Sequence, residues 1–217
     1  MNSQPAKKNP YRSRLRAEQA AATCQLVLDT ATRLFLERGY ASTSIDVIAE
    51  TAGIGRSTVF AAAGGKPWLL KTAYDRAIVG DDQKVPFLER TEARKLFEMT
   101  DPAQIVTAYA GIFSDAVPRV SPIYEVVRSA AGVDAEVYQL WTDISDQRLA
   151  GAQTIAALLK TKRGLRKGLS VDAARDIIWI YNDPGLHHAL VSQRGWSQHK
   201  YRAWLAETLR QQLLARS

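Results

Sequence analysis

The sequence has little of several features that mark particular classes of protein. It has one cysteine, Cys24, so an intramolecular disulfide is excluded, which suits the reducing cytoplasm in which we expect the protein. No run approaches about 18 apolar residues, so we expect no membrane-spanning helix. The N-terminus lacks the apolar stretch of a secretory signal. Glycine and proline are also scarce, and 46% of the residues are hydrophobic, which is typical of a globular chain.

Patterns for catalysis and metal binding are scarce as well. The three histidines lie close together in the chain, and no serine or cysteine is paired with a histidine and an orienting carboxylate. His187 and His188 are adjacent, so on a helix they point in different directions, and no further histidine or cysteine completes a metal-binding set. We therefore expect no enzyme, no metal and no cofactor.

Positive charge is what the sequence has in excess. The formal net charge is +7, and residues 1–70 hold nine Lys/Arg against five Asp/Glu, a net of +4. Such an excess favours a polyanion such as nucleic acid as partner. Residues 1–16 are polar and basic, and we interpret them as a flexible basic arm, with a solubilising tail as the open alternative.

Apolar spacing predicts helices throughout and no strands, hence an all-α fold. The first helix starts near Ala17 and shows one apolar face, made by Cys24, Val27, Leu28, Ala31, Leu34 and Phe35. Gly39 should end it, and Thr43 and Ser44 stand where an N-cap is expected. Longer helices should follow a loop at 80–86, at about 91–99, 102–117, 121–131, 134–161, 170–182 and 198–214, with Asp101 and Ser170 as caps.

The stretch "AETAGIGRSTVFAAAGGK", residues 49–66, invites a nucleotide-binding interpretation. A phosphate-binding loop is excluded because Pro67 stands where the hydroxyl residue is required and no buried strand precedes it. A dinucleotide fingerprint is excluded because Thr58 replaces the third glycine. A helix-turn-helix fits, because Gly53 can form the tight turn and Arg56, Ser57 and Thr58 begin the next helix. A generic helical hairpin is the alternative.

These residues resemble the N-terminal domain of the TetR family of bacterial transcriptional regulators. The resemblance covers about residues 18–78 and is carried by Phe35, Gly39, Tyr40, Thr43, Ser44, Ile48, Ala49, Ala52, Gly53, Arg56, Thr58, Phe60, Gly64, Lys66, Leu69 and Leu70. The segment "GWSQHKYRAWLAETLRQQLL" is similar to a branch of the family common in actinobacteria.

The resemblance implies a homodimer with an N-terminal three-helix DNA-binding domain and a C-terminal helical domain for dimerisation and ligand binding. We place the arm at 1–16, the helix-turn-helix domain at 17–66 with its motif at about 45–64, and the second domain at 67–217. The resemblance implies DNA contacts by Thr43, Ser44, Arg56, Ser57, Thr58, Phe60 and Lys66. Ala62 and Ala63 depart from the family pattern, which has aromatic residues there, and this predicts a smaller DNA footprint.

In the second domain, aromatic residues at helical spacing are candidates for binding a small-molecule effector, although such residues are also typical of a core. The candidates are Tyr109, Phe113, Tyr124, Arg128, Tyr138, Trp141 and Trp179. The resemblance implies that two apolar helices of each subunit pair about a two-fold axis, which makes the dimerisation candidates Ile177, Ile178, Tyr201, Trp204, Leu205, Leu209 and Leu213. The basic segment 160–168 is interpreted as a solvated loop, with a second DNA contact as the alternative.

Together these patterns predict a sequence-specific DNA-binding regulator, a repressor that a small-molecule effector releases from operator DNA. Two alternatives stay open. One is a regulator that works without a small-molecule effector, and the other is an all-α protein or enzyme that binds a small molecule without contacting DNA.

Overall fold

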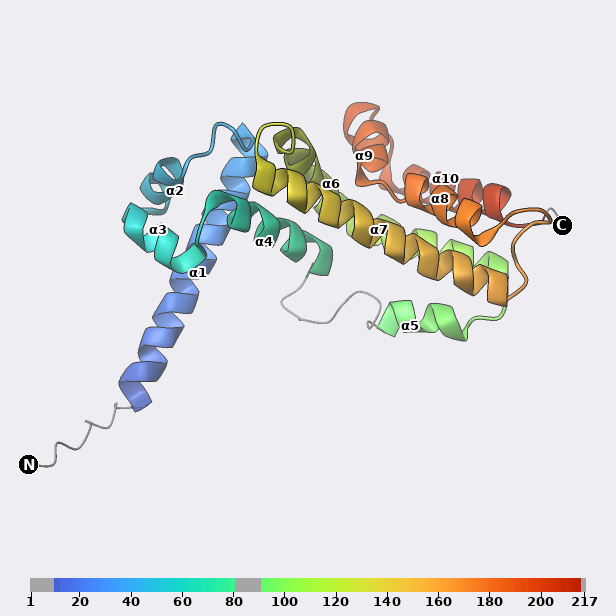
Figure 1. Ribbon diagram of the computed structural model, residues 1–217, viewed down its shortest axis with the longest axis horizontal. Coiled ribbons are helices and arrows are strands. Elements are labelled where there is room, and N and C mark those ends of the chain that lie inside the picture. Colours follow the sequence, from blue (N-terminus) through green and yellow to red (C-terminus); the bar gives the residue numbers. More distant parts are fainter. Residues whose placement is uncertain (1–9, 81–90, 216–217) are drawn as a thin grey trace, which may run out of the picture. The chain divides into compact units, whose positions relative to one another are not determined.

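The computed structural model describes residues 10–80 and 91–215 (Figure 1). The helices are α1 Pro10–Arg38, α2 Ile45–Ala52, α3 Arg56–Ala63, α4 Lys66–Val79, α5 Thr91–Glu98, α6 Pro102–Ala130, α7 Ala135–Thr161, α8 Val171–Tyr181, α9 Pro184–His187, the π-helix η2 His188–Gln193, and α10 Gln198–Leu213. Within these residues the only extended pairing is an isolated bridge between Leu165 and Leu214. The predicted all-α fold is confirmed.

The chain divides into two compact units, Met1–Ala73 and Tyr74–Ser217, and the boundary falls inside α4. The expected boundary at residues 66 and 67 coincides with the start of this helix. Helix α1 begins earlier than expected, so residues 10–16 of the expected arm are helical. Residues 1–9 lie outside the described part of the chain.

The first unit is built on the apolar face of α1. Val27, Ala31, Leu34 and Phe35 are fully buried, as the spacing predicts, whereas Cys24 is only partly buried. Ile48 of α2, Val59 of α3, and Leu69 and Leu70 of α4 complete this core. Its three short helices are therefore held by packing, because helices of about this length are marginal alone in water.

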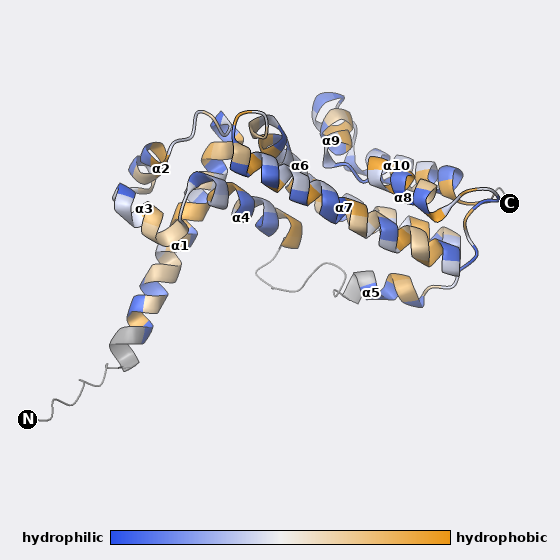
Figure 2. Ribbon diagram, in the orientation of Figure 1, coloured by the Kyte–Doolittle hydropathy of each residue, from blue (hydrophilic) through white to orange (hydrophobic). Residues whose placement is uncertain are grey.

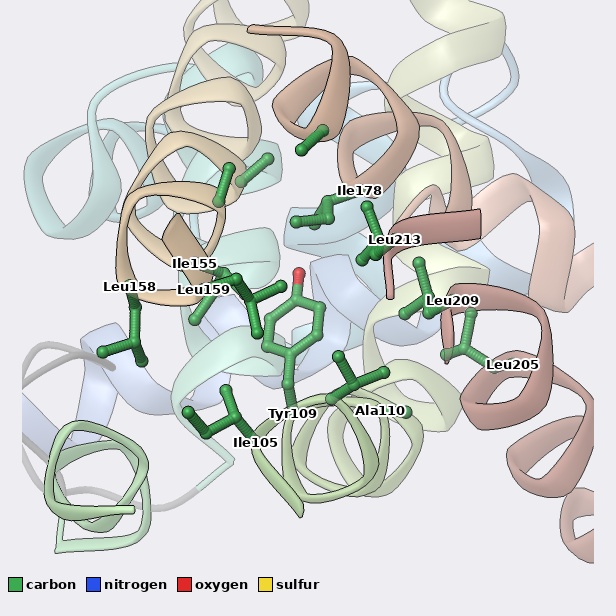
Figure 3. Packing of buried hydrophobic residues seen from close by; sticks show 14 of the residues in the cluster. Ile105, Tyr109, Ala110, Ile155, Leu158, Leu159, Ile178, Leu205, Leu209 and Leu213 are labelled. Carbon is green, nitrogen blue, oxygen red and sulfur yellow. The ribbon is translucent and has the colours of Figure 1, made fainter. Parts of the chain in front are cut away.

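The second unit is arranged around two long helices, α6 and α7, which run side by side in Figure 1. Helix α8 packs on α7, and α10 packs on α6 and α8. Figure 2 shows hydrophobic and hydrophilic residues interleaved along these helices, as expected of helices with one buried face. Figure 3 shows the resulting core, in which the ring of Tyr109 rises from α6 among side chains of α7, α8 and α10.

The prediction of two helices at 102–117 and 121–131 was wrong, because α6 runs without a break through Pro118 and Pro122. Both prolines are exposed, so their rings face solvent. A proline has no N–H, so Pro118 cannot bond the carbonyl of Ser114 one turn earlier. That carbonyl instead accepts a hydrogen bond from Nε2 of Gln198 in α10. A side chain far along the sequence thus satisfies the group that the proline leaves open.

The other predicted helices and caps are close to those observed. Asp101 and Ser170 cap α6 and α8 as expected, since their side chains accept hydrogen bonds from Ala103 N and Ala173 N. Helices α9 and η2 were not predicted. Arg166, in the loop after α7, donates from its backbone N to Leu213 O and from Nε to Gln212 O, at 2.8 and 2.9 Å. These bonds satisfy carbonyls at the C-terminal end of α10.

Candidate DNA-binding surface and effector region

The bend between α2 and α3 is the first element of the candidate DNA-binding surface. Ser44 caps α2, its Oγ accepting a hydrogen bond from Val47 N. Gly53 ends α2 in the left-handed conformation at φ 67°, and Ile54 N donates to Ala49 O at 3.1 Å. Because side chains other than glycine rarely adopt that conformation, Gly53 permits the chain to reverse directly into α3. Ala49 and Val59 are buried beside this bend.

The first turn of α3 presents exposed polar residues. Arg56, Ser57 and Thr58 are exposed, and Phe60 is 45% exposed although it is a large apolar residue. Nη1 of Arg56 lies 2.7 Å from Oδ2 of Asp46 in α2, and the guanidinium carbon lies 5.6 Å from the centre of the Phe60 ring. A short helix that displays an arginine, two hydroxyls and an aromatic ring is suited to the major groove of DNA.

Thr43 differs from the other expected DNA contacts. It is fully buried, its hydroxyl lies 2.9 Å from Gly39 O and 3.3 Å from Leu34 O, and its backbone N–H bonds Tyr40 O. Both polar groups are thus used inside the domain, where they fix the turn between α1 and α2. We therefore withdraw Thr43 as a DNA contact and retain Ser44, which is exposed.

The end of α3 and the start of α4 form the remaining part of the surface. Ala63 is 4% exposed, so it fills a core position with a small side chain, and Ala62 is half-buried. Lys66 begins α4, and its Nζ lies 3.7 Å from the centre of the Tyr40 ring. This cation–π contact places the ammonium group of Lys66 over the buried ring of Tyr40.

The effector candidates separate into two groups. Tyr109, Phe113, Tyr124, Trp141 and Trp179 are buried or partly buried, and the rings of Tyr124 and Trp141 are 5.0 Å apart. Arg128 is exposed and bonds Glu125 Oε2 through Nε and Nη2, at 2.9 and 2.6 Å, and Tyr138 is 60% exposed. We therefore withdraw Arg128 and Tyr138, since neither faces the interior of the unit.

An arginine that the sequence analysis missed lies beside these aromatic residues. The Arg148 side chain, from α7, is 12% exposed, and its Nη2 lies 3.2 Å from Asp183 Oδ2 and 2.8 Å from Trp179 O. Its guanidinium stacks on the rings of Tyr124 and Trp179. Asn182 extends the network, because its Nδ2 donates to the Tyr109 hydroxyl at 3.1 Å. Arg148 lies in a helix rich in polar residues, so no sequence signal distinguishes it from a surface arginine.

Several buried polar atoms of the second unit have no hydrogen-bond partner among the described residues. They are Ser114 Oγ, Arg148 Nε, Gln153 Oε1, Trp179 Nε1, His187 Nδ1 and Tyr201 Oη. Buried polar groups normally have a hydrogen-bond partner, so these atoms mark polar positions inside the unit. Burial raises the pKa of Tyr201 and so keeps its hydroxyl a neutral donor.

His187 occupies a defined place in this interior. It is 4% exposed, its ring packs edge-on against Tyr201 at 5.0 Å, and its Nε2 lies 2.9 Å from Gln198 Oε1. Because Gln198 donates from Nε2 to Ser114 O, its oxygen must accept, so His187 carries its proton on Nε2. Burial lowers the pKa of His187. Among the described residues no group of three or more His, Cys, Asp and Glu side chains is placed to bind a metal.

The residues expected at the dimer interface are mostly inside the second unit. Five of them belong to its core and are at most 1% exposed: Ile178, Tyr201, Leu205, Leu209 and Leu213. They pack against α6 and α7 and cannot meet a partner subunit, so we withdraw them. Ile177 and Trp204 are only partly buried, and Ile180 of α8, which was not predicted, is 54% exposed.

No helix in the described part of the chain is both long enough and apolar enough to cross a membrane. The basic segment 160–168 begins in the last residues of α7 and continues into its connection to α8, where Arg166 binds the end of α10. Residues 1–9 and 81–90, which include part of the expected arm and of the expected loop at 80–86, are outside the described ranges.

Residues 27–72 match the family model of bacterial regulatory proteins of the tetR family. Solved structures similar to the whole chain include NalD, the secondary repressor of the MexAB-OprM multidrug efflux pump in Pseudomonas aeruginosa, with a TM-score of 0.69 and 17% identity over 92% of this chain and 100% of NalD. None of the curated proteins matches this chain.

Two further similar structures hold ligands. One is a transcriptional regulator from Saccharomonospora viridis in complex with choline, with a TM-score of 0.69 and 16% identity over 90% of this chain and 100% of that chain. The other is FadR from Bacillus subtilis in complex with stearoyl-CoA, with a TM-score of 0.67 and 17% identity over 87% of this chain and 98% of FadR. Residues 27–72 therefore carry a helix-turn-helix region that matches the tetR family model, and the chain shares its fold with these solved transcriptional regulators.

Proposed function

We propose that the protein is a repressor that binds operator DNA as a homodimer in the cytoplasm and releases it when a small molecule binds the second unit. The single observation that supports DNA binding is the exposed first turn of α3, which follows the bend at Gly53. In this turn Arg56, Ser57 and Thr58 are exposed to solvent. Phe60 and Lys66 would add contacts, and Ser44 would meet a phosphate at the N-terminus of α2.

Two copies are required by the geometry of DNA. Successive turns of the major groove are about 34 Å apart, so two recognition helices must be presented at that spacing to read a two-fold symmetric site. We propose that the outer surface of α8 and α10 pairs with a second copy, because Ile180 is 54% exposed and Ile177 and Trp204 are only partly buried. Ile177 and Ile180 are three residues apart on α8, so they lie on one face of the helix and would form the apolar centre of the contact.

For the effector we propose the interior of the second unit, near Tyr109, Phe113, Tyr124, Trp141 and Trp179. Unpartnered buried donors there, on Arg148, Trp179 and Tyr201, would be satisfied by a ligand that carries acceptor oxygens. Choline and stearoyl-CoA are found in structures of similar fold, which supports a ligand-binding role but does not transfer either ligand to this chain.

Selection of bound fragments from a genomic DNA library tests the DNA-binding part. We expect enrichment of a two-fold symmetric sequence, and the variant Arg56→Ala should lose this enrichment while it melts at the wild-type temperature. Enrichment of no sequence by the wild-type protein would refute the proposal.

For effector release, compounds that raise the melting temperature of the protein should also free the selected duplex in a gel-shift assay. Stabilising compounds that leave the complex intact would contradict effector release.

A further inference from the structure

Asp46 faces the arginine at the start of α3 across the helix-turn-helix bend. It lies in the first turn of α2, and its two carboxylate oxygens lie 2.8 and 2.7 Å from Nη1 of Arg56. The two side chains are 63% and 60% exposed, so the pair is on the outside of the domain. An exposed ion pair of this kind adds little to folding stability. Its position therefore needs another explanation.

The contact uses one edge of the guanidinium and leaves another edge open. Both Asp46 oxygens are bound by the single nitrogen Nη1, and among the described residues Nε and Nη2 of Arg56 have no hydrogen-bond partner. The ring of Phe60, one turn further along α3, lies 5.6 Å from the guanidinium carbon. Asp46 and Phe60 thus restrict the orientation of the Arg56 guanidinium, and the edge formed by Nε and Nη2 remains available for further hydrogen bonds.

That open edge matches guanine. Guanine presents two acceptors, N7 and O6, in the major groove, and an arginine with two parallel N–H groups binds both. Asp46 can keep its bond to Nη1 while Nε and Nη2 bind the base, because the two contacts use different nitrogens. A side chain that is already oriented loses less rotational freedom when it binds, and the arrangement favours one base over the others.

We propose that Asp46 is a positioning residue that orients Arg56 and so makes the regulator selective for guanine at one position of each half-site. This inference rests on the proposed DNA-binding function. It explains why an acidic residue is tolerated beside Ser44, where its charge must repel the phosphates that the same helix approaches.

The proposal predicts two changes of opposite sign when Asp46 is made neutral. The variant Asp46→Asn removes a negative charge near the phosphates, so binding to a duplex of unrelated sequence should become about two- to fivefold tighter at low salt. The same variant frees the guanidinium, so the preference for one G·C pair over A·T should fall about three- to tenfold. Asp46→Ala should behave in the same way.

A matched control is available on the same helix. Glu50 is exposed in α2, one turn beyond Asp46, and makes no ion pair with Arg56. Glu50→Gln removes the same charge, so it should tighten binding to unrelated DNA but leave the guanine preference unchanged. Dissociation constants would be measured for the full-length proteins on the selected site, on copies with each G·C pair replaced by A·T, and on an unrelated duplex.

The outcomes separate this proposal from the function on which it rests. Unchanged guanine preference in Asp46→Asn and Asp46→Ala, with a wild-type protein that binds its selected site, would overturn the positioning role and leave DNA binding intact. Equal loss of preference in Glu50→Gln would overturn it as well, because the effect would then come from charge alone. A wild-type protein with no sequence preference would refute the proposed function and this inference together.

Discussion

At the scale of single residues, the two units place their arginines in different environments. Arg56 is exposed and oriented by its neighbours, whereas Arg148 is almost buried and bonded to Asp183 and to the backbone of Trp179. Residue type does not distinguish the two arginines, and only Arg56 lies in a sequence motif, the helix-turn-helix, that indicates its exposure. Their roles follow from the helices that pack around them.

His187 gives a residue-scale prediction about pH. Its pKa is lowered in the folded state, so the unfolded state binds more protons and protonation favours unfolding. The stabilisation is present above the unfolded pKa of about 6.5 and is lost as the pH falls below that value. We expect the urea midpoint to fall as the pH is lowered below about 6.5, and His187→Gln to lessen this fall.

His199→Asn is the matched control for this experiment, because His199 is exposed on α10. It should keep the wild-type pH dependence. A His187→Gln protein whose midpoint falls with pH as steeply as the wild type would show that other groups cause the dependence.

At the scale of elements, turns and prolines determine how the helices begin, bend and end. Gly53 has φ 67°, and a Cβ added to it would meet nothing within 4 Å. Gly151 lies inside α7 and also has open space around it, but its backbone is helical. The two positions therefore separate the effect of backbone conformation from that of crowding.

We expect Gly53→Ala to destabilise the protein by about 1–2 kcal/mol, because alanine is strained in the left-handed region. Gly151→Ala should stabilise it by about 0.5–1 kcal/mol, because alanine is the better helix former. Thermal unfolding followed by circular dichroism measures both. Destabilisation of similar size by the two substitutions would contradict this explanation.

A second element-scale prediction concerns Pro118 and Gln198. Gln198→Ala removes the hydrogen bond to the Ser114 carbonyl, which Pro118 leaves open, and we expect a loss of about 1–3 kcal/mol. In a Pro118→Ala background, residue 118 can donate to that carbonyl, so the loss should be smaller by about 1 kcal/mol. A double-mutant cycle in urea measures this difference. Additive effects of the two substitutions would show that the N–H of residue 118 does not replace Gln198 as donor to the Ser114 carbonyl.

Much of this helical architecture could be predicted from the sequence. The stripe of α1, the cap Ser44 and the bend at Gly53 follow from local rules of spacing and backbone conformation. The continuity of α6 could not, because Gln198, which compensates Pro118, is far away in the sequence. The helical spacing of Tyr109 and Trp179 indicated that both lie in the interior of the second unit. Arg148 and Asn182, which bond to them there, could be identified only from the fold, because their partners are also far away in the sequence.

At the scale of the whole molecule, assembly depends on which apolar residues the folded subunit leaves outside. The stripe of α10 contains leucines that the sequence alone cannot assign to a core or an interface, since either environment selects the same residues. The structure places Leu205, Leu209 and Leu213 in the core and leaves Ile180 54% exposed.

We therefore expect Ile180→Glu to weaken pairing of two copies, because a charge at a subunit contact must be desolvated. Sedimentation velocity should show a shift from dimer toward monomer, with weaker binding to the selected duplex and little change in melting temperature at high protein concentration. Tyr138→Glu is the control, since Tyr138 is 60% exposed on α7. A wild-type protein that sediments as a monomer would refute the proposed pairing.

The hydrogen bonds of Arg166 have a consequence for motion at the end of the chain. The last turn of a helix normally frays, because its carbonyls have no partners within the helix. Here the carbonyls of Gln212 and Leu213 are bound by Arg166, so the terminus of α10 can open only if the segment after α7 opens with it. Amide protons near Leu214 should then exchange with deuterium at rates close to those of the interior, and peptides on both sides of this link should exchange in concert.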